Sequence, residues 1–183
     1  KEFIRNSLKQ LDKTKIGDTI RHMKLSVEGN ENYAAQYVRL TEFAEIPGAN
    51  TIKHAIIHGN RVIVAKEVTY GDFGIFFPVE SQIAKDFLSF NNQFSHKEAN
   101  KDQEKVGYFE EKGRVRCVRF MKVPSEGFFC PLNYLTHWKG IATKNWELVR
   151  LDTKFDHING YKLCNKYIIR VPQVQGVRVG RKV

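Results

Sequence analysis

The feature that most constrains the fold is a series of short β-rich segments separated by turn residues about every 8–12 positions. In order along the chain these are a first strand from Tyr37, a turn at 45–50, a hairpin at 51–68 joined across Gly59-Asn60, and a buried strand at 73–81 ended by Pro78. Gly and Asn are favoured at a hairpin centre because they adopt the positive φ of a tight turn. Pro is favoured at a strand end because it has no N–H to donate to the ladder. The pattern predicts antiparallel strands in a small β-barrel.

The rest of the chain adds little helix. Residues 81–90 predict a short helix, and residues 91–105, the most polar stretch, predict a mobile loop. A strand rich in basic residues follows at 113–129, and a last strand lies near 163–171. Because strands do not alternate with long helices, we expect a mainly β protein, an OB-like small β-barrel with peripheral helices.

The pattern divides the chain into three parts. Residues 1–30 predict an N-terminal helical appendage, because Phe3, Ile4, Leu8 and Leu11 recur at helical spacing. Residues 31–171 form the predicted OB-like nucleic-acid-binding domain. Residues 172–183 combine Gly, Pro and basic residues with little to bury, and predict a linker.

The net charge of +10 is concentrated in the second half of the chain. Residues 1–100 hold 13 basic and 12 acidic side chains, whereas residues 101–183 hold 17 basic and 8 acidic ones. Such an asymmetry indicates an anionic partner, nucleic acid first, although a solvated basic surface kept for solubility has the same composition.

Five basic residues interrupt the apolar pattern of the basic strand: Lys112, Arg114, Arg116, Arg119 and Lys122. Side chains alternate along a strand, so Arg114 and Arg116 share one face and Arg119 falls on the other. We predict that the five form a nucleic-acid-binding strip, in which Arg119 is the residue expected to make a structural ion pair. The alternative is that the arginines pair with Glu110, Glu111 and Glu126.

Base stacking requires aromatic rings beside such a strip. The candidates near it in sequence are Tyr108, Phe109, Phe128, Phe129, Tyr134 and Trp138, most of which we expect in the core.

Motifs for metal and redox chemistry are missing. His54 and His58 have the spacing of zinc ligands on a helix, but the Glu of a His-Glu-x-x-His motif is absent and their segment predicts a strand. Cys117, Cys130 and Cys164 form no Cys-x-x-Cys pair, which indicates reduced thiols and a cytoplasmic protein. No apolar run approaches the roughly 20 residues that span a bilayer, so we expect no membrane partner.

Three segments occur in a recognisable order. The first contains Pro47-Gly48-Ala49-Asn50, the hairpin, Gly71-Asp72, the strand FGIFFPV and Glu80-Ser81; the second is KVGYFEEKGRVRCVRFMKVPSEGFFCPL at 105–132; the third is FDHINGYKLCNKYIIRV at 155–171. Together they resemble ATP-dependent RNA ligases, phage and bacterial members included, that carry an OB-like domain ahead of their nucleotidyltransferase domain. The chain departs from that family at Met121-Lys122-Val123-Pro124, where an Arg-Gly turn is usual.

The resemblance implies a lysine nucleophile within Lys-x-Asp-Gly, but none of the 13 glycines has a lysine three positions before it. We therefore expect a non-catalytic fragment with no cofactor of its own, cut at the linker toward a missing catalytic domain. ATP and magnesium are expected for the parent ligase. The first residue is Lys rather than Met, which agrees with this expectation.

The function that the resemblance implies is a nucleic-acid-binding module that positions 3′-OH and 5′-phosphate ends for sealing. The expected partners are nucleic acid, as RNA or an RNA-containing duplex, and the parent's own C-terminal nucleotidyltransferase domain. Two other interpretations stay open: a stand-alone RNA- or tRNA-binding OB protein, and a protein-interaction barrel.

Overall fold

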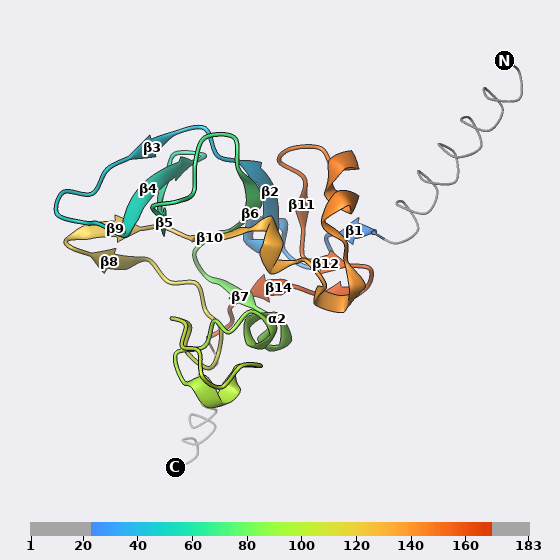
Figure 1. Ribbon diagram of the computed structural model, residues 1–183. Helices are drawn as coiled ribbons and strands as arrows, with labels where there is room; N and C mark the ends of the chain where they lie inside the picture. The colour runs from blue at the N-terminus through green and yellow to red at the C-terminus, as the bar shows by residue number, and fades with distance from the viewer. Residues whose placement is uncertain (1–22, 170–183) are drawn as a thin grey trace, which may run out of the picture.

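The structure is a computed structural model, and it describes residues 23–169 (Figure 1). The strands in this range are β1 (Leu25–Ser26), β2 (Ala35–Arg39), β3 (Phe43–Ala44), β4 (Ile52–Ile57), β5 (Asn60–Ala65), β6 (Phe73–Phe77), β7 (Ser81–Ile83), β8 (Val118–Phe120), β9 (Val123–Ser125), β10 (Phe128–Pro131), β11 (Lys154–Phe155), β12 (His157–Ile158), β13 (Tyr161–Lys162) and β14 (Cys164–Lys166). The helices are the α-helix α2 (Lys85–Phe90) and the 3₁₀ helices η1 (Glu31–Tyr33), η2 (Lys97–Ala99), η3 (Leu132–Tyr134), η4 (Trp138–Gly140) and η5 (Thr143–Leu148). The prediction of a mainly β protein is confirmed.

An antiparallel sheet in the order β10-β6-β2-β11 forms the middle layer of the fold. Its side chains alternate, so that Ile75 and Phe77 of β6 enter one core and Phe76 enters another. Because both faces are buried, β6 is a continuous apolar run rather than an alternating one. Gly74 lets its neighbours approach: a β-carbon there would lie 2.3 Å from Phe129 Cζ.

The hairpin β4–β5 covers one face of this sheet, with β3 along its edge. The predicted hairpin is confirmed, although its two turn residues are His58 and Gly59, at φ values of 49° and 82°. Positive φ at both positions matches the twist of a two-residue hairpin. The hairpin and the sheet enclose the smaller core, which consists of Val38, Leu40, Ala55, Ile57, Val62, Val64, Phe76 and Phe129.

The strands follow one another around a ring without forming a closed barrel. β2 pairs with β6 and its continuation β3 pairs with β4, while β9 contacts β5 and leads into β10 beside β6. The chain crosses between the layers at Gly127, which has a φ of 143° and where a β-carbon would lie 2.5 Å from Phe76 Cε1. Because the strands in residues 23–169 stay in separate sheets, the predicted barrel is only partly closed.

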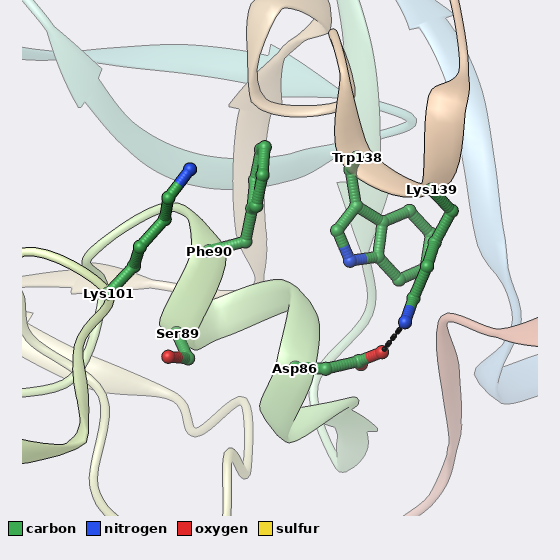
Figure 2. Close-up of a pocket in the computed structure, with 6 residues that line it drawn as sticks. All are labelled: Asp86, Ser89, Phe90, Lys101, Trp138 and Lys139. Atoms are coloured by element: carbon green, nitrogen blue, oxygen red, sulfur yellow. Dashed lines mark ion pairs between the residues drawn. The ribbon is translucent and has the colours of Figure 1, made fainter.

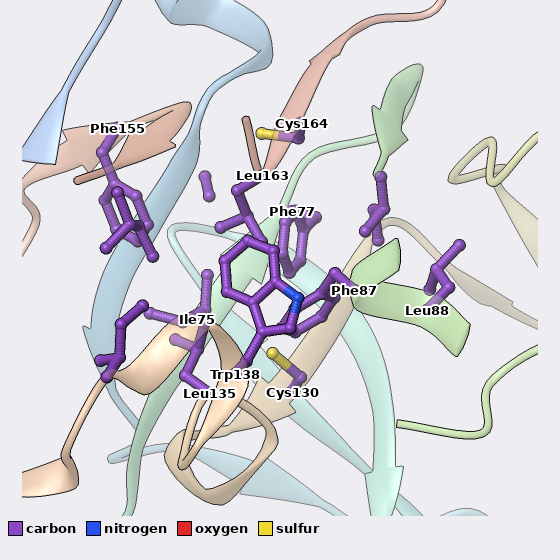
Figure 3. Close-up of a cluster of buried hydrophobic side chains, with 14 of the residues drawn as sticks. Ile75, Phe77, Phe87, Leu88, Cys130, Leu135, Trp138, Phe155, Leu163 and Cys164 are labelled. Carbon is purple, nitrogen blue, oxygen red and sulfur yellow. The ribbon is translucent and has the colours of Figure 1, made fainter. Parts of the chain in front are cut away.

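The larger core lies on the other face of the central sheet, against α2, the 3₁₀ helices and the C-terminal strands (Figure 3). Phe87 and Trp138 meet edge to face at its centre, with ring centroids 5.2 Å apart. Among residues 23–169 no hydrogen-bond partner reaches Trp138 Nε1, and Figure 3 places this atom beside Phe87, whose ring can receive the N–H. The cluster also includes Leu135, Ile141, Trp146, Phe155, Ile158 and Leu163.

The basic stretch is not one strand, and this prediction is wrong. Residues 113–115 run beside β7, where Val115 N donates to Ser81 O at 2.9 Å and Ile83 N donates to Gly113 O at 2.9 Å. β14 pairs with the other edge of β7. The chain then leaves this small sheet and forms the separate hairpin β8–β9. The break occurs because residue 115 is buried against β7, whereas β9 packs on β5 in another layer.

The polar stretch 91–105 forms a loop that is held by the buried side chain of Asn100. The Asn100 amide donates to Phe94 O at 3.0 Å and to Lys105 O at 2.8 Å, and its Oδ1 accepts from Phe94 N at 2.9 Å. A loop was predicted here, and these bonds supply it with an internal anchor.

The predicted N-terminal helix falls on residues outside the described range, and so does the predicted linker 172–183. The described end of the 1–30 segment contains β1, which pairs with β12. Asp156 is buried and accepts hydrogen bonds at 2.8 Å from the backbone N–H groups of both Glu28 and Gly29. These bonds fasten the segment to the C-terminal strands.

Between residues 23 and 169, no helix has the length and apolar character needed to cross a membrane. The same range contains no group of three His, Cys, Asp or Glu side chains able to hold a metal ion. All three cysteines are free, with Cys117 exposed and the other two buried. Burial raises the pKa of Cys130, and it raises the pKa of Cys164 to about 12.

Candidate nucleic-acid interface

Strand β9 of the hairpin β8–β9 lies along the edge of β5, where Ile63 N donates to Ser125 Oγ at 3.0 Å and Glu126 N donates to Arg61 O at 2.7 Å. In OB folds the face of the second and third barrel strands commonly binds oligonucleotides. A β-carbon on Gly48 would lie 3.2 Å from Cε of Met121 at the tip of the hairpin. Beneath the hairpin, His54 is 3% exposed, and the backbone of Pro124 favours its protonated form. A nucleic acid that approaches this side of the fold therefore meets the hairpin first.

Met121 and Lys122 form the turn of this hairpin, with φ values of 49° and 70°. The left-handed conformation costs roughly 1–2 kcal/mol for a residue that has a side chain, which is why Gly and Asn are usual in such turns. This is the place where the sequence departs from the Arg-Gly turn of RNA ligases. The hairpin forms despite this difference in sequence, and Lys122 supplies a cation at its tip.

The two basic residues of this hairpin, Arg119 and Lys122, are exposed and are called the hairpin pair below. Arg119 Nη1 donates to the carbonyl of Lys122 at 3.2 Å. Within residues 23–169 neither side chain makes an ion pair, so the ion pair predicted for Arg119 does not form there.

The other three predicted residues lie at the small sheet. Lys112 is exposed, and its backbone carbonyl accepts from Gln82 Nε2 at 2.9 Å. Arg114 is bidentate to Glu80, with Nε–Oε1 at 3.1 Å and Nη2–Oε2 at 2.9 Å. The Arg114 guanidinium also lies 4.6 Å from the ring centre of Tyr167. The hydrogen bond to Glu80, which neither charge nor spacing had indicated, raises the pKa of Arg114.

Arg116 has a carboxylate partner too, because its Nη2 donates to Glu110 Oε2 at 2.7 Å. Glu110 is one of the three carboxylates predicted as alternative partners. Structural pairing is therefore present at Arg114 and Arg116, where carboxylates occupy part of each guanidinium's N–H donors. The structure separates the five predicted residues into three at the small sheet, namely Lys112 and the two arginines paired with carboxylates, and the hairpin pair, which makes no ion pair within residues 23–169.

Two exposed aromatic rings lie beside the basic residues. Tyr108 is 42% exposed and Phe120 is 37% exposed, with ring centroids 6.4 Å apart. Partial burial raises the pKa of the Tyr108 phenol, and the charge of Arg116 opposes that rise.

Among the other predicted stacking candidates, Phe109, Phe129 and Trp138 are buried, and Phe128 and Tyr134 are half-buried. Phe120 was not among the candidates. The available signal was its position directly before the turn residues Met121-Lys122, where side chains leave the sheet.

A shallow pocket of about 300 Å³ lies beside Trp138, on the larger-core side of the central sheet (Figure 2). Lys139 Nζ lies 3.0 Å from Asp86 Oδ2, and Lys101 Nζ lies 4.5 Å from the ring centre of Phe90. Ser89 completes its lining, and none of the five predicted residues lines it.

A family model of the OB-fold domain matches residues 35–132, more than half of the chain. The chain belongs to this OB-fold domain family. The match begins at β2 and ends at the start of η3, so it includes the ring of strands, the small-sheet arginines and the hairpin β8–β9. A comparison with curated proteins gave no match.

Among solved structures, the chain is similar to several forms of Naegleria gruberi RNA ligase. For an apo mutant the TM-score is 0.47 at 19% identity, covering 76% of this chain and 36% of the ligase. For a mutant with ATP and Mn the TM-score is 0.45 at 18% identity, covering 72% and 33%. For a mutant with AMP and Mn it is 0.44 at 19% identity, covering 66% and 32%. This chain thus spans about a third of the length of those ligases.

Proposed function

We propose that this chain is a nucleic-acid-binding module of an RNA ligase, which positions 3′-OH and 5′-phosphate ends for ATP-dependent sealing by a nucleotidyltransferase domain. Membership of the OB-fold domain family and the three segments that resemble RNA ligases support the proposal. The bound nucleic acid is RNA or an RNA-containing duplex, and the module works in the cytoplasm. ATP and magnesium belong to the nucleotidyltransferase domain rather than to this one.

The observation that carries the proposal is the hairpin pair. Arg119 and Lys122 hold two cations beside the usual binding face of an OB fold, without a carboxylate partner in the described part of the chain. Contacts between such cations and phosphates release counterions and orient the strand without reading its sequence. Lys112, Arg114 and Arg116 extend the strip, and the two arginines exchange Glu80 and Glu110 for phosphates when RNA binds.

The test is the salt dependence of RNA binding by the double variant Arg119→Gln/Lys122→Gln. Fluorescence anisotropy of a labelled single-stranded RNA 12-mer is measured between 50 and 200 mM NaCl (conditions of the order at which such slopes are read). Loss of two phosphate contacts lowers the slope of log K against log salt by about 1.4, at about 0.7 for each contact. The affinity falls for every RNA sequence.

The matched control is Lys144→Gln/Lys162→Gln, which removes the same charge from exposed positions in the C-terminal part of the fold. It should leave the slope unchanged. Equal effects of the two double variants contradict a nucleic-acid contact at the hairpin. A Lys-x-Asp-Gly motif encoded beyond codon 183 supports the ligase assignment, and a stop codon there contradicts it.

A further inference from the structure

Tyr108 and Phe120 differ from the exposed residues Tyr70 and Tyr161, because a cation lies over the ring of each of those two tyrosines. Arg39 lies over the ring of Tyr70 at 5.3 Å, and Lys139 lies over the ring of Tyr161 at 5.1 Å. Within residues 23–169 no cation lies over Tyr108 or Phe120. Tyr108 is 42% exposed and Phe120 is 37% exposed, so part of each ring is accessible to a planar group from outside.

The Tyr108 ring is also held in place. It meets Phe109 at 4.9 Å between centroids, and Phe109 meets Phe128 at 4.9 Å, perpendicular to it. The backbone is fixed as well, because Tyr108 N donates to Gln93 O at 2.9 Å and a β-carbon on Gly107 would lie 2.3 Å from the Gln93 carbonyl carbon. A ring anchored to the core in this way loses little freedom when a ligand stacks on it.

The charges around the two rings favour an anionic occupant. The charge of Arg116 lowers the pKa of the Tyr108 phenol, and Lys122 lies in the turn of the same hairpin, two residues after Phe120. A nucleic-acid strand places its bases on aromatic rings and its phosphates against the neighbouring cations. A continuous duplex cannot do this, since its base faces are already stacked on one another.

We propose that Tyr108 and Phe120 form a base-stacking platform for unpaired nucleotides of single-stranded RNA, next to the hairpin pair. The inference rests on the proposed nucleic-acid binding and adds that the RNA bound at this place is single-stranded. The single-stranded stretch adjoining an end to be sealed is the chemical class of ligand that fits the platform.

The experiment compares Tyr108→Ala/Phe120→Ala with the unmodified chain, using a labelled single-stranded oligo(U) and a blunt RNA duplex with the same number of phosphates. Stacking predicts that affinity for the single strand falls at least about tenfold, because each lost base–ring contact has an effect of this order. Affinity for the duplex and the salt slope stay unchanged, since no charge is removed. The control Tyr70→Ala/Tyr161→Ala should have no effect.

A second variant, Tyr108→Leu/Phe120→Leu, keeps apolar packing against Phe109 while it removes both π-faces and the Tyr108 hydroxyl, and thermal melts verify its folding. It should show the same selective loss. If both double variants bind the single strand as the unmodified chain does, or lose single strand and duplex equally, the stacking platform is wrong while RNA binding by the hairpin pair stands. If the unmodified chain binds neither RNA, the proposed function itself fails.

Discussion

The two faces of the central sheet are built differently (Figure 1). One face closes the smaller, mostly aliphatic core under the hairpin β4–β5, within the range matched by the OB-fold family. The other face carries the larger core, with Trp138 and Trp146, and most of its covering layer lies beyond residue 132. The first face places the basic hairpin, and the second provides most of the buried apolar surface. The OB ring therefore carries the candidate interface, and we expect its stability to depend on residues outside the family match.

The largest expected effect comes from removing the second layer. A chain of residues 23–132 loses Leu135, Trp138, Ile141, Trp146 and Phe155, all of them at most 2% exposed. Burial of each such side chain is worth about 1.5–3 kcal/mol, against a typical total stability of about 5–15 kcal/mol. We expect the shortened chain to lack a cooperative melt and near-ultraviolet circular dichroism, both of which the 23–169 chain should show. A cooperative melt of the shorter chain would mean that the ring is stable alone.

Matched aromatic truncations compare the two cores within the intact chain. Phe77 is fully buried in the larger core and contacts Phe87 and Phe128, whereas Phe129 borders the smaller core. We expect Phe77→Ala to lower the free energy of unfolding by about 4 kcal/mol and Phe129→Ala by about 3 kcal/mol. Urea denaturation measures both. The reverse order would show that the hairpin side contributes more to stability than its buried volume indicates.

Asp156→Asn tests how firmly the N-terminal segment is attached on the larger-core side. Burial raises the pKa of Asp156, but hydrogen bonds from His157, Glu28 and Gly29 more than offset this, so the carboxylate stays ionised. Weakening these charge-assisted bonds should cost about 2 kcal/mol in urea denaturation. Asp152→Asn is the control, because Asp152 pairs with His58 at the surface and its replacement should change stability by under about 1 kcal/mol. Equal effects would contradict an attaching role for Asp156.

The smallest expected effect is a dependence of stability on pH, which arises from His54 on the hairpin side of the central sheet. Burial and the charge of Arg61 lower the pKa of His54 below its usual 6.5, so the folded state favours the neutral ring more than the unfolded state does. The contribution of His54 to stability is complete above pH 6.5 and declines as the pH falls below that value. His54→Phe should flatten this decline between pH 7.5 and pH 5.5 (a window that spans the usual His pKa) in urea midpoints. An unchanged decline would assign it to other groups.

The strands of the ring could be predicted because local sequence determines them. Gly59 fixes the hairpin turn, and Pro78 ends β6 because it cannot donate to the ladder. Most of the C-terminal layer could not be predicted, since η4, η5 and β11 to β13 are too short to show a hydrophobic period, whereas β14 lies within the strand predicted near 163–171. Their positions are set by packing against the central sheet.

The sequence identified the five basic residues of the candidate site, but it did not predict how they are arranged in the fold. Arg114 pairs with Glu80, 34 positions away, which becomes a neighbour only because β7 lies beside residues 113–115. The alternation of side chains along a single strand could not predict that Arg119 lies in a different sheet from Arg114 and Arg116. The chain changes sheets before it reaches β8. Whether any of the five residues contacts RNA stays a prediction.

Burial of two of the three thiols has a practical consequence. Cys130 and Cys164 are enclosed in the larger core, while Cys117 lies at the surface, two residues before Arg119. The unmodified chain thus offers a single attachment point for a maleimide dye, beside the hairpin where RNA is proposed to bind. The number of thiols that react per molecule then also serves as a counter of unfolding, because the other two become reachable only when the larger core opens.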